Sequence, residues 1–135
     1  MTKKEKNKAL LAGCASGDFN KVRLALNFGA DVNPKGNGGW TPLHLATYHN
    51  HIQIAKFLID RGADVNAKAN GGRTPLHEAV LNNATEVAKL LLDKGADVEA
   101  KNVYGNTPLD LARSDEMKDL FKKYKKRLAK KKNIV

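Results

Sequence analysis

Two short strings recur along this chain at a constant spacing of 33 residues. Thr-Pro-Leu occupies positions 41–43, 74–76 and 107–109. Gly-Ala-Asp-Val occupies positions 29–32, 62–65 and 95–98, so it keeps the same step. Two independent strings that share one period indicate a tandem repeat, in which each unit stacks on its neighbours. The sequence therefore predicts a solenoid that works through an extended surface rather than through a deep pocket.

One unit, residues 36–68, shows how the first helix of each repeat is expected to form. Its positions 37–39 are asparagine and two glycines, which accept positive φ and favour a turn. Thr41 is a suitable N-cap, because its hydroxyl can accept a free N–H of the first helical turn. Pro42 suits the first helical position, where its missing N–H is not needed. Apolar residues then predict a short helix that ends at about His49.

A second helix is expected in the same unit. Asn50 stands where the chain must turn, and asparagine tolerates the left-handed conformation. Positions 52, 54, 55, 58 and 59 are apolar at helical spacing, and Gly62 is placed to end the helix. Residues 69–101 copy this plan, with a turn at Asn83 and a stop at Gly95. Neither helix is long enough to be stable alone, so the units must stack to bury their apolar faces.

The two ends of the chain differ from the middle. Residues 1–35 predict two helices without a Thr-Pro opening, which is typical of an N-terminal capping unit. Residues 102–126 keep the Thr-Pro-Leu string, which predicts a further helix pair, but Asp110 replaces histidine and no Gly-Ala-Asp string follows. This is typical of a C-terminal capping unit, and residues 127–135 form a basic tail. We expect a single domain over residues 1–135, with two full repeats between the caps.

The strings at 41–46 (TPLHLA) and 74–79 (TPLHEA) resemble the T-P-L-H-x-A pattern of the ankyrin-repeat family. The resemblance extends over nearly the whole chain. It implies a mainly α solenoid of helix-turn-helix units joined by β-turn or hairpin loops. It also implies a non-enzymatic module that binds a protein partner, whose identity the sequence does not give. We further expect the protein to be a monomer.

The resemblance implies where a partner would bind. In the family, partners usually contact the loop tips and the exposed side of the first helices, which together line a concave face. The loop-tip positions are Asn37, Gly38, Asn70, Gly71 and Val103. The positions expected to make the main contacts are Trp40, Tyr48, His49, Arg73, Leu81, Asn82, Tyr104 and Asn106. Tryptophan, tyrosine and arginine dominate measured interfaces. The alternative is that an aromatic side chain beside a turn packs on its neighbour and binds nothing.

His44 and His77 share one repeat position and invite a catalytic or metal-binding interpretation. The resemblance instead implies a structural role, in which the ring bonds the threonine hydroxyl and backbone near the neighbouring turn. No serine–histidine–acid set, phosphate loop or dinucleotide motif is present. The single cysteine, Cys14, excludes an intrachain disulfide and is expected to be buried and inert. We therefore expect no enzyme activity, no cofactor and no metal site.

Asn33 and Asn66 follow Asp-Val in successive units. Their side chains are expected to hold the turn by hydrogen bonds. The resemblance adds hydroxylation as an alternative, because asparagines at this place are hydroxylated in some animal ankyrin proteins.

Most of the net charge of +10 lies at the two ends of the chain, and the repeats between them are close to neutral. The densest basic stretch contains Lys122, Lys123, Lys125, Lys126 and Arg127. Such residues complement a helix C-terminus and keep a cap soluble. Alternatively, they bind nucleic acid or an anionic membrane, or act as a nuclear-import signal.

The cellular location is expected from what the sequence lacks. No apolar run approaches the ~18 residues that a membrane span requires, and residues 1–6 are not followed by the apolar stretch of a secretory signal. With only one cysteine, this predicts an intracellular, cytoplasmic protein, with the nucleus as the alternative. A consensus-like scaffold without a natural partner is a further alternative, although Asn50, Asn83 and Asp110 depart from a strict consensus.

Overall fold

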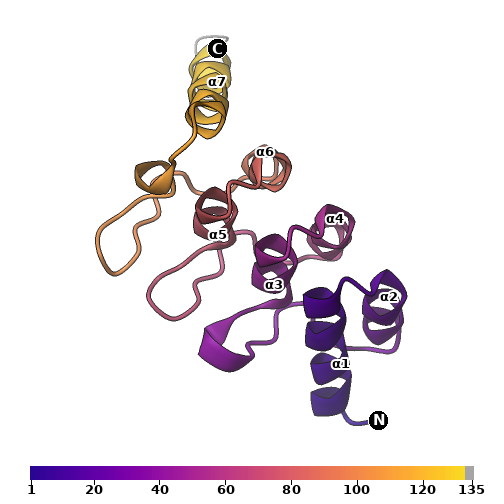
Figure 1. Ribbon diagram of the computed structural model, residues 1–135. Coiled ribbons are helices and arrows are strands. Elements are labelled where there is room, and N and C mark those ends of the chain that lie inside the picture. The colour runs from indigo at the N-terminus through magenta and orange to yellow at the C-terminus, as the bar shows by residue number, and fades with distance from the viewer. Residues whose placement is uncertain (133–135) are drawn as a thin grey trace.

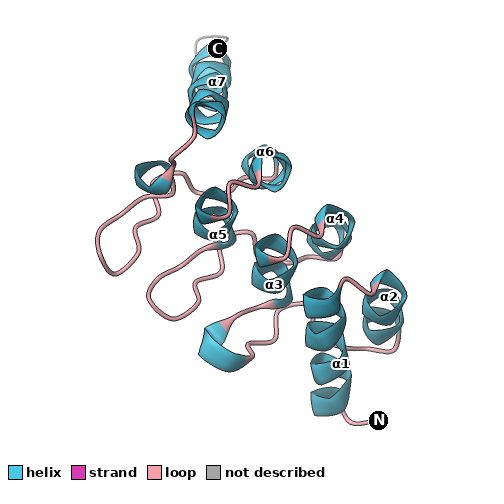
Figure 2. Ribbon diagram, viewed as in Figure 1, coloured by secondary structure: helices cyan, strands magenta, loops and turns pink. Residues whose placement is uncertain are grey.

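The computed structural model describes residues 1–132, and its helices are stacked in pairs along one axis (Figures 1 and 2). The α-helices are α1 (Lys3–Ser16), α2 (Phe19–Asn27), α3 (Pro42–Tyr48), α4 (Ile52–Asp60), α5 (Pro75–Leu81), α6 (Thr85–Asp93) and α7 (Asp115–Lys132). Two short 3₁₀ turns, η1 (Asn37–Gly39) and η2 (Leu109–Leu111), complete the regular structure of these residues. The mainly helical solenoid that the sequence predicts is confirmed.

The stack has two rows of helices with loops on one side. Helices α1, α3 and α5 form a middle row, and α2, α4 and α6 form a second row beside it, to the right in Figure 1. The loops that precede α3, α5 and η2 project from the middle row on the side away from the second row (Figure 2). Successive loops are linked by backbone hydrogen bonds, from Asn70 N–H to Gly38 O and from Val103 N–H to Gly71 O, both 2.8 Å long. The loop tips therefore form a continuous edge of the molecule.

In each internal unit, the helices start, turn and end at the residues that the sequence predicts. The hydroxyl of Thr41 accepts the N–H of His44 at 3.3 Å, and Pro42 is the first residue of α3. Asn50 and Asn83 turn the chain with φ of 57° and 52°. Gly62 ends α4 with φ of 96°, a region that is strained for residues with a Cβ. The predicted helix starts, turns and stops are thus confirmed for the two internal units.

A single apolar core runs along the stack. Equivalent leucines from successive units, including Leu43 and Leu76 in the middle row and Leu58 and Leu91 in the second, are at most 1% exposed. Cys14 is fully buried in the same core. Burial raises the pKa of its thiol to about 12, so the thiol stays protonated and unreactive, as the sequence predicts.

The last unit corrects one expectation. Its Thr-Pro-Leu string was expected to open a helix, but it opens only the turn η2, because Ala112 has extended backbone with ψ of 129°. The hydroxyl of Ser114 accepts the N–H of Met117 at 3.1 Å and starts α7 directly afterwards. Since α7 then runs as far as Lys132, the expected boundary between the last unit and the tail, at residues 126 and 127, lies inside this helix. Residues 133–135 of that tail lie outside the described residues.

None of the helices described is both long and apolar enough to cross a membrane.

Candidate interaction surface

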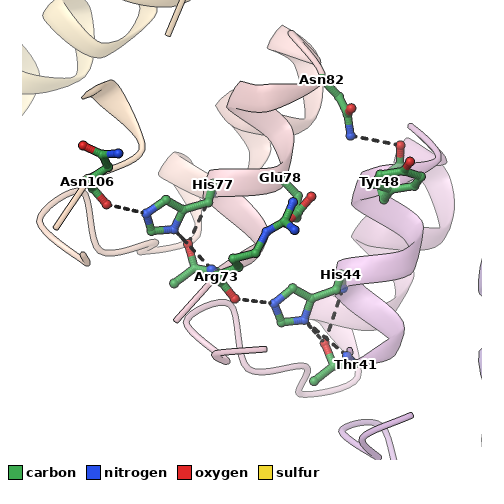
Figure 3. Close-up of polar contacts among 9 residues, drawn as sticks. Thr41, His44, Tyr48, Arg73, His77, Glu78, Asn82 and Asn106 are labelled. Atoms are coloured by element: carbon green, nitrogen blue, oxygen red, sulfur yellow. Dashed lines mark hydrogen bonds and ion pairs between the residues drawn. The ribbon is translucent and has the colours of Figure 1, made fainter. Parts of the chain in front are cut away.

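The two repeat histidines connect each internal unit to the next loop. His44 Nε2 lies 2.8 Å from the carbonyl oxygen of Arg73, so this nitrogen donates. His44 Nδ1 then accepts from the Thr41 hydroxyl at 2.8 Å and from the Thr41 N–H at 3.2 Å. His77 repeats the arrangement with Thr74 and the carbonyl of Asn106 (Figure 3). The structural role that the resemblance implies is therefore what the geometry supports.

Both imidazole rings are held neutral. His44 and His77 are fully buried, and this desolvation lowers the pKa of each ring below its ordinary value. The hydrogen bond that each ring donates to a carbonyl opposes the shift without reversing it. A neutral ring, with one nitrogen donating and the other accepting, fits its site. All its polar atoms are committed to the fold, so it is not available as a catalytic base.

Three of the predicted contact residues lie together. Trp40 and Tyr48 meet edge to face, with ring centroids 5.3 Å apart. The guanidinium carbon of Arg73 lies 5.8 Å from the centroid of the Trp40 ring, within the range of a cation–π interaction. Tyr48 remains 47% exposed. We call Trp40, Tyr48 and Arg73 the aromatic–arginine cluster. The two aromatic rings pack on their neighbours, as the alternative interpretation expects. Tyr48 nevertheless keeps exposed surface that a partner can contact.

The cluster has a buried support that the sequence analysis missed. The carboxylate of Glu78, on α5, forms an ion pair with Arg73 Nε and is only 1% exposed (Figure 3). Burial raises the pKa of this carboxyl, while the neighbouring guanidinium lowers it. The available signal was a charge at a repeat position that is apolar in the other units, where Ala12, Leu45 and Leu111 stand. Glu78 holds the arginine beside Trp40 and so fixes the geometry of the exposed surface.

Three further predicted residues lie at the C-terminal ends of α3 and α5, next to this cluster. His49 lies against Tyr48 with ring centroids 5.0 Å apart, and it is exposed. Asn82 Nδ2 donates to the carbonyl of Tyr48 at 3.2 Å, which ties the ends of α3 and α5 together (Figure 3). Leu81 is half-buried, and its carbonyl accepts from the guanidinium of Arg113 at 2.9 Å. The predicted positions on the first helices thus form one neighbourhood.

The predicted residues of the third loop lie apart from the cluster. This loop stands beyond the second loop, at the far end of the row from the first (Figure 1). Tyr104 and Val103 are 85% and 69% exposed near its tip. Asn106 contributes its carbonyl to His77 rather than to the cluster. The third loop therefore offers a separate exposed apolar tip.

Asn33 and Asn66 hold the turns as expected, and they do so between units. Asn33 Oδ1 accepts the N–H of Asp64 at 2.9 Å, and its Nδ2 donates to the carbonyl of Gly62 at 3.4 Å. Asn66 makes the same pair of bonds to residues 95 and 97. Their hydroxylation stays a prediction.

The basic stretch belongs to α7. Lys122, Lys123, Lys125 and Lys126 are exposed along this helix. Arg127 forms an ion pair with Asp93 of α6 at 2.9 Å, so it contributes to packing as well as charge. Across residues 1–132, no group of three or more His, Cys, Asp or Glu side chains is arranged to hold a metal ion.

Part of this sequence is similar to known proteins. Human protein phosphatase 1 regulatory subunit 27 is 39% identical over 51 residues, which are 38% of this chain and 33% of that protein. Human ankyrin repeat and SOCS box protein 16 is 46% identical over 52 residues, 38% of this chain and 12% of that protein. The Notch-regulated ankyrin repeat-containing protein of Xenopus tropicalis is 36% identical over 53 residues, 39% of this chain and 46% of that protein. The matched stretch thus spans less than half of each of these relatives.

Family models cover most of the chain. Residues 1–69 match a model described as ankyrin repeats in three copies, and residues 58–112 match one described as ankyrin repeats in many copies. The first model alone covers half of the sequence, and the stacked helix pairs with histidine-linked loops agree with it. The chain therefore belongs to the ankyrin-repeat family.

Proposed function

We propose that this protein binds a protein partner through its concave face, formed by the loops and the adjoining sides of α1, α3 and α5. Ankyrin repeats generally mediate protein–protein interaction and are typically non-enzymatic. The observation that carries the proposal is the aromatic–arginine cluster, in which Trp40, Tyr48 and Arg73 are held together by the buried Glu78. A preorganised aromatic and arginine surface loses little conformational entropy on binding, which favours affinity.

The rest of the predicted set extends this face. His49, Leu81 and Asn82 border the cluster, and Tyr104 and Asn106 lie on the third loop. A partner segment that follows the row of loop tips would pass the cluster first and reach Tyr104 last. We propose that the cluster provides most of the binding energy and that the third loop provides specificity.

The test is a comparison of two double variants. Partners are captured from a native extract with the wild-type protein and identified by mass spectrometry, and their affinities are then measured with purified components. Trp40→Ala with Tyr48→Ala is expected to weaken binding at least about tenfold, since truncating an interface hot spot costs ~2 kcal/mol or more. Leu24→Ala with Phe28→Ala, at exposed apolar positions in α2 and at its C-cap, is the matched control. Equal affinities for both variants, with circular dichroism unchanged, would show that the partner uses another face.

A second function rests on α7. Four exposed lysines over residues 122–126 place a dense positive charge on one helix, and we propose binding to nucleic acid or an anionic membrane as the alternative role of this surface. Truncation is a poor test, because Tyr124 packs against the core. Replacing the four lysines by glutamine and measuring the salt dependence of binding to duplex DNA and to phosphatidylserine vesicles avoids that problem. Absence of salt-dependent binding in the wild type would end this alternative.

A further inference from the structure

The first loop meets a different neighbour from the other loops. The second and third loops each donate a backbone hydrogen bond to the loop before them, from Asn70 and Val103. No loop precedes the first one within the repeat row, and α1 stands there instead (Figure 1). The helix openings at Pro42 and Pro75 correspond to Ala9 in the first unit, yet α1 already begins at Lys3. The extra turns of α1 therefore lie where the other units place a loop.

This mismatch leaves a groove of about 450 Å³ between α1, the first loop and α3. Apolar side chains dominate its lining, contributed by Leu11, Ala12, Trp40 and Leu45. Gly36 also lines it, and a Cβ there would lie 3.3 Å from Leu11 Cδ1. The equivalent positions in the next two units carry alanine and asparagine. Glycine at this position therefore avoids a tight contact with the Leu11 side chain where α1 faces the first loop.

The rim of the groove is positively charged. Lys8 lines it, and Lys4 lies one helical turn earlier on the same side of α1. Both side chains are exposed, and neither forms an ion pair within the described part of the chain. The acidic residue of α1, Glu5, is already used in the capping box with Thr2. An apolar groove beside uncompensated lysines is complementary to an acidic segment that carries a large apolar side chain.

We propose that this groove binds an extended acidic segment of the partner protein, with one aromatic or leucine side chain inserted against Trp40 and Leu45. Carboxylates that flank this side chain lie near Lys4 and Lys8. The apolar anchor supplies affinity by burying surface, and the lysines supply orientation and a salt-dependent association rate. The inference rests on the proposed function, because it names the partner chemistry of one part of the same face.

The only tryptophan of the chain lines this groove, so its fluorescence reports on occupancy. The probe is an acetylated pentapeptide with a central leucine flanked by glutamates. Its matched peptides carry lysines in place of the glutamates, or alanine in place of the leucine. The acidic leucine peptide is expected to give a saturable change in emission that weakens with salt. A groove with the proposed specificity binds each matched peptide at least about tenfold more weakly.

Two surface variants test the location. Ala12→Glu places a carboxylate at an exposed position on the groove wall, and Lys8→Glu reverses the charge of the rim. Both are expected to weaken binding of the acidic leucine peptide about tenfold or more. Lys56→Glu makes the same charge change at an exposed lysine of α4, away from the groove, and is expected to alter this affinity less than about twofold. No saturable signal, equal binding of the lysine peptide, or unchanged binding to Ala12→Glu would each overturn the proposal.

The same variants separate this proposal from the broader one. If a captured partner is lost by the Trp40 and Tyr48 double variant but retained by Ala12→Glu and Lys8→Glu, the concave face stands and the acidic-segment groove is wrong. Loss of the partner in all three variants, with normal circular dichroism, supports both.

Discussion

The internal units and the last unit use the same Thr-Pro-Leu string with different outcomes. In the internal units, His44 and His77 join the helix opening to the carbonyl of the next loop. In the last unit, Asp110 accepts the N–H of Thr107 at 2.9 Å and makes only the local half of this arrangement. No further loop follows the last unit in the described chain, so a ring that reaches across would have no acceptor. The comparison separates two roles of one position, which are capping a helix within a unit and joining two units.

The largest expected effect comes from removing an internal joint. His44→Ala leaves the Arg73 carbonyl without its donor and the hydroxyl and N–H of Thr41 without their ring acceptor, and it opens a cavity. The free energy of unfolding should therefore fall by about 3 kcal/mol. Asp110→Ala removes only the exposed carboxylate that accepts the Thr107 N–H and should cost clearly less. Urea unfolding of both variants gives the two values. Equal losses would mean that joining units contributes nothing beyond capping.

Acid should break the internal joints before it affects the last unit. Burial lowers the pKa of His44 and His77 in the folded state, so their contribution is complete above pH 6.5 and is lost as the pH falls below it. Each ring contributes a slope of at most about 1.4 kcal/mol per pH unit. The bonds to Thr107 lower the pKa of Asp110, so its contribution is lost only below pH 3.8. Between pH 7.5 and pH 5.5 we therefore expect the free energy of unfolding of the wild type to fall, with most of the loss below pH 6.5.

The control for the acid experiment is the double variant His44→Gln with His77→Gln. It removes the two buried groups and should flatten the dependence of unfolding free energy on pH over this range. A slope that survives in the double variant would assign the acid sensitivity to other groups.

Local chemistry made the internal units predictable. Thr41, Pro42, Asn50 and Gly62 each act within a few residues of their own position, so the sequence strings carry the information directly. In the last unit, the helix expected after Thr-Pro-Leu is only the short turn η2. This could not be predicted from the string itself, because Ser114 starts α7 a few residues later.

The candidate site was only partly predictable for a related reason. Trp40, Tyr48 and Arg73 were identified by residue type at equivalent repeat positions, and they do lie together. Glu78 was missed because its role depends on burial and on the direction in which the Arg73 side chain folds. The groove beside α1 was missed because repeat equivalence assumes a loop where the first unit has helix. The residues of the proposed site depart from the repeat, and how they contact one another depends on the three-dimensional fold rather than on local sequence.

A smaller effect on the free energy of unfolding is expected from Gly62, which ends the second helix of an internal unit. Gly62 has φ of 96°, and a Cβ added there would have no neighbour within 4 Å, so substitution costs backbone strain alone. Gly62→Val should lower the free energy of unfolding by more than about 1 kcal/mol, because β-branched residues are poor at positive φ. Gly62→Asn should cost less, since asparagine accepts positive φ at positions 50 and 83. An unchanged melting temperature for Gly62→Val would contradict the C-cap assignment.

The smallest effect is expected where the last unit is tied to the stack by charge. The ion pair between Arg127 and Asp93 joins α7 to α6 at 2.9 Å, but the two side chains are 56% and 39% exposed. Water screens such a pair, so Arg127→Ala should cost about 0.5 kcal/mol, and high salt should remove most of the difference from the wild type. Lys126→Ala, at an exposed neighbouring position, controls for loss of charge on α7. If Arg127→Ala instead lowered the free energy of unfolding as much as His44→Ala, independently of salt, the ion pair would stabilise the stack as strongly as a buried histidine. The proposed contrast between the internal units and the last unit would then be wrong.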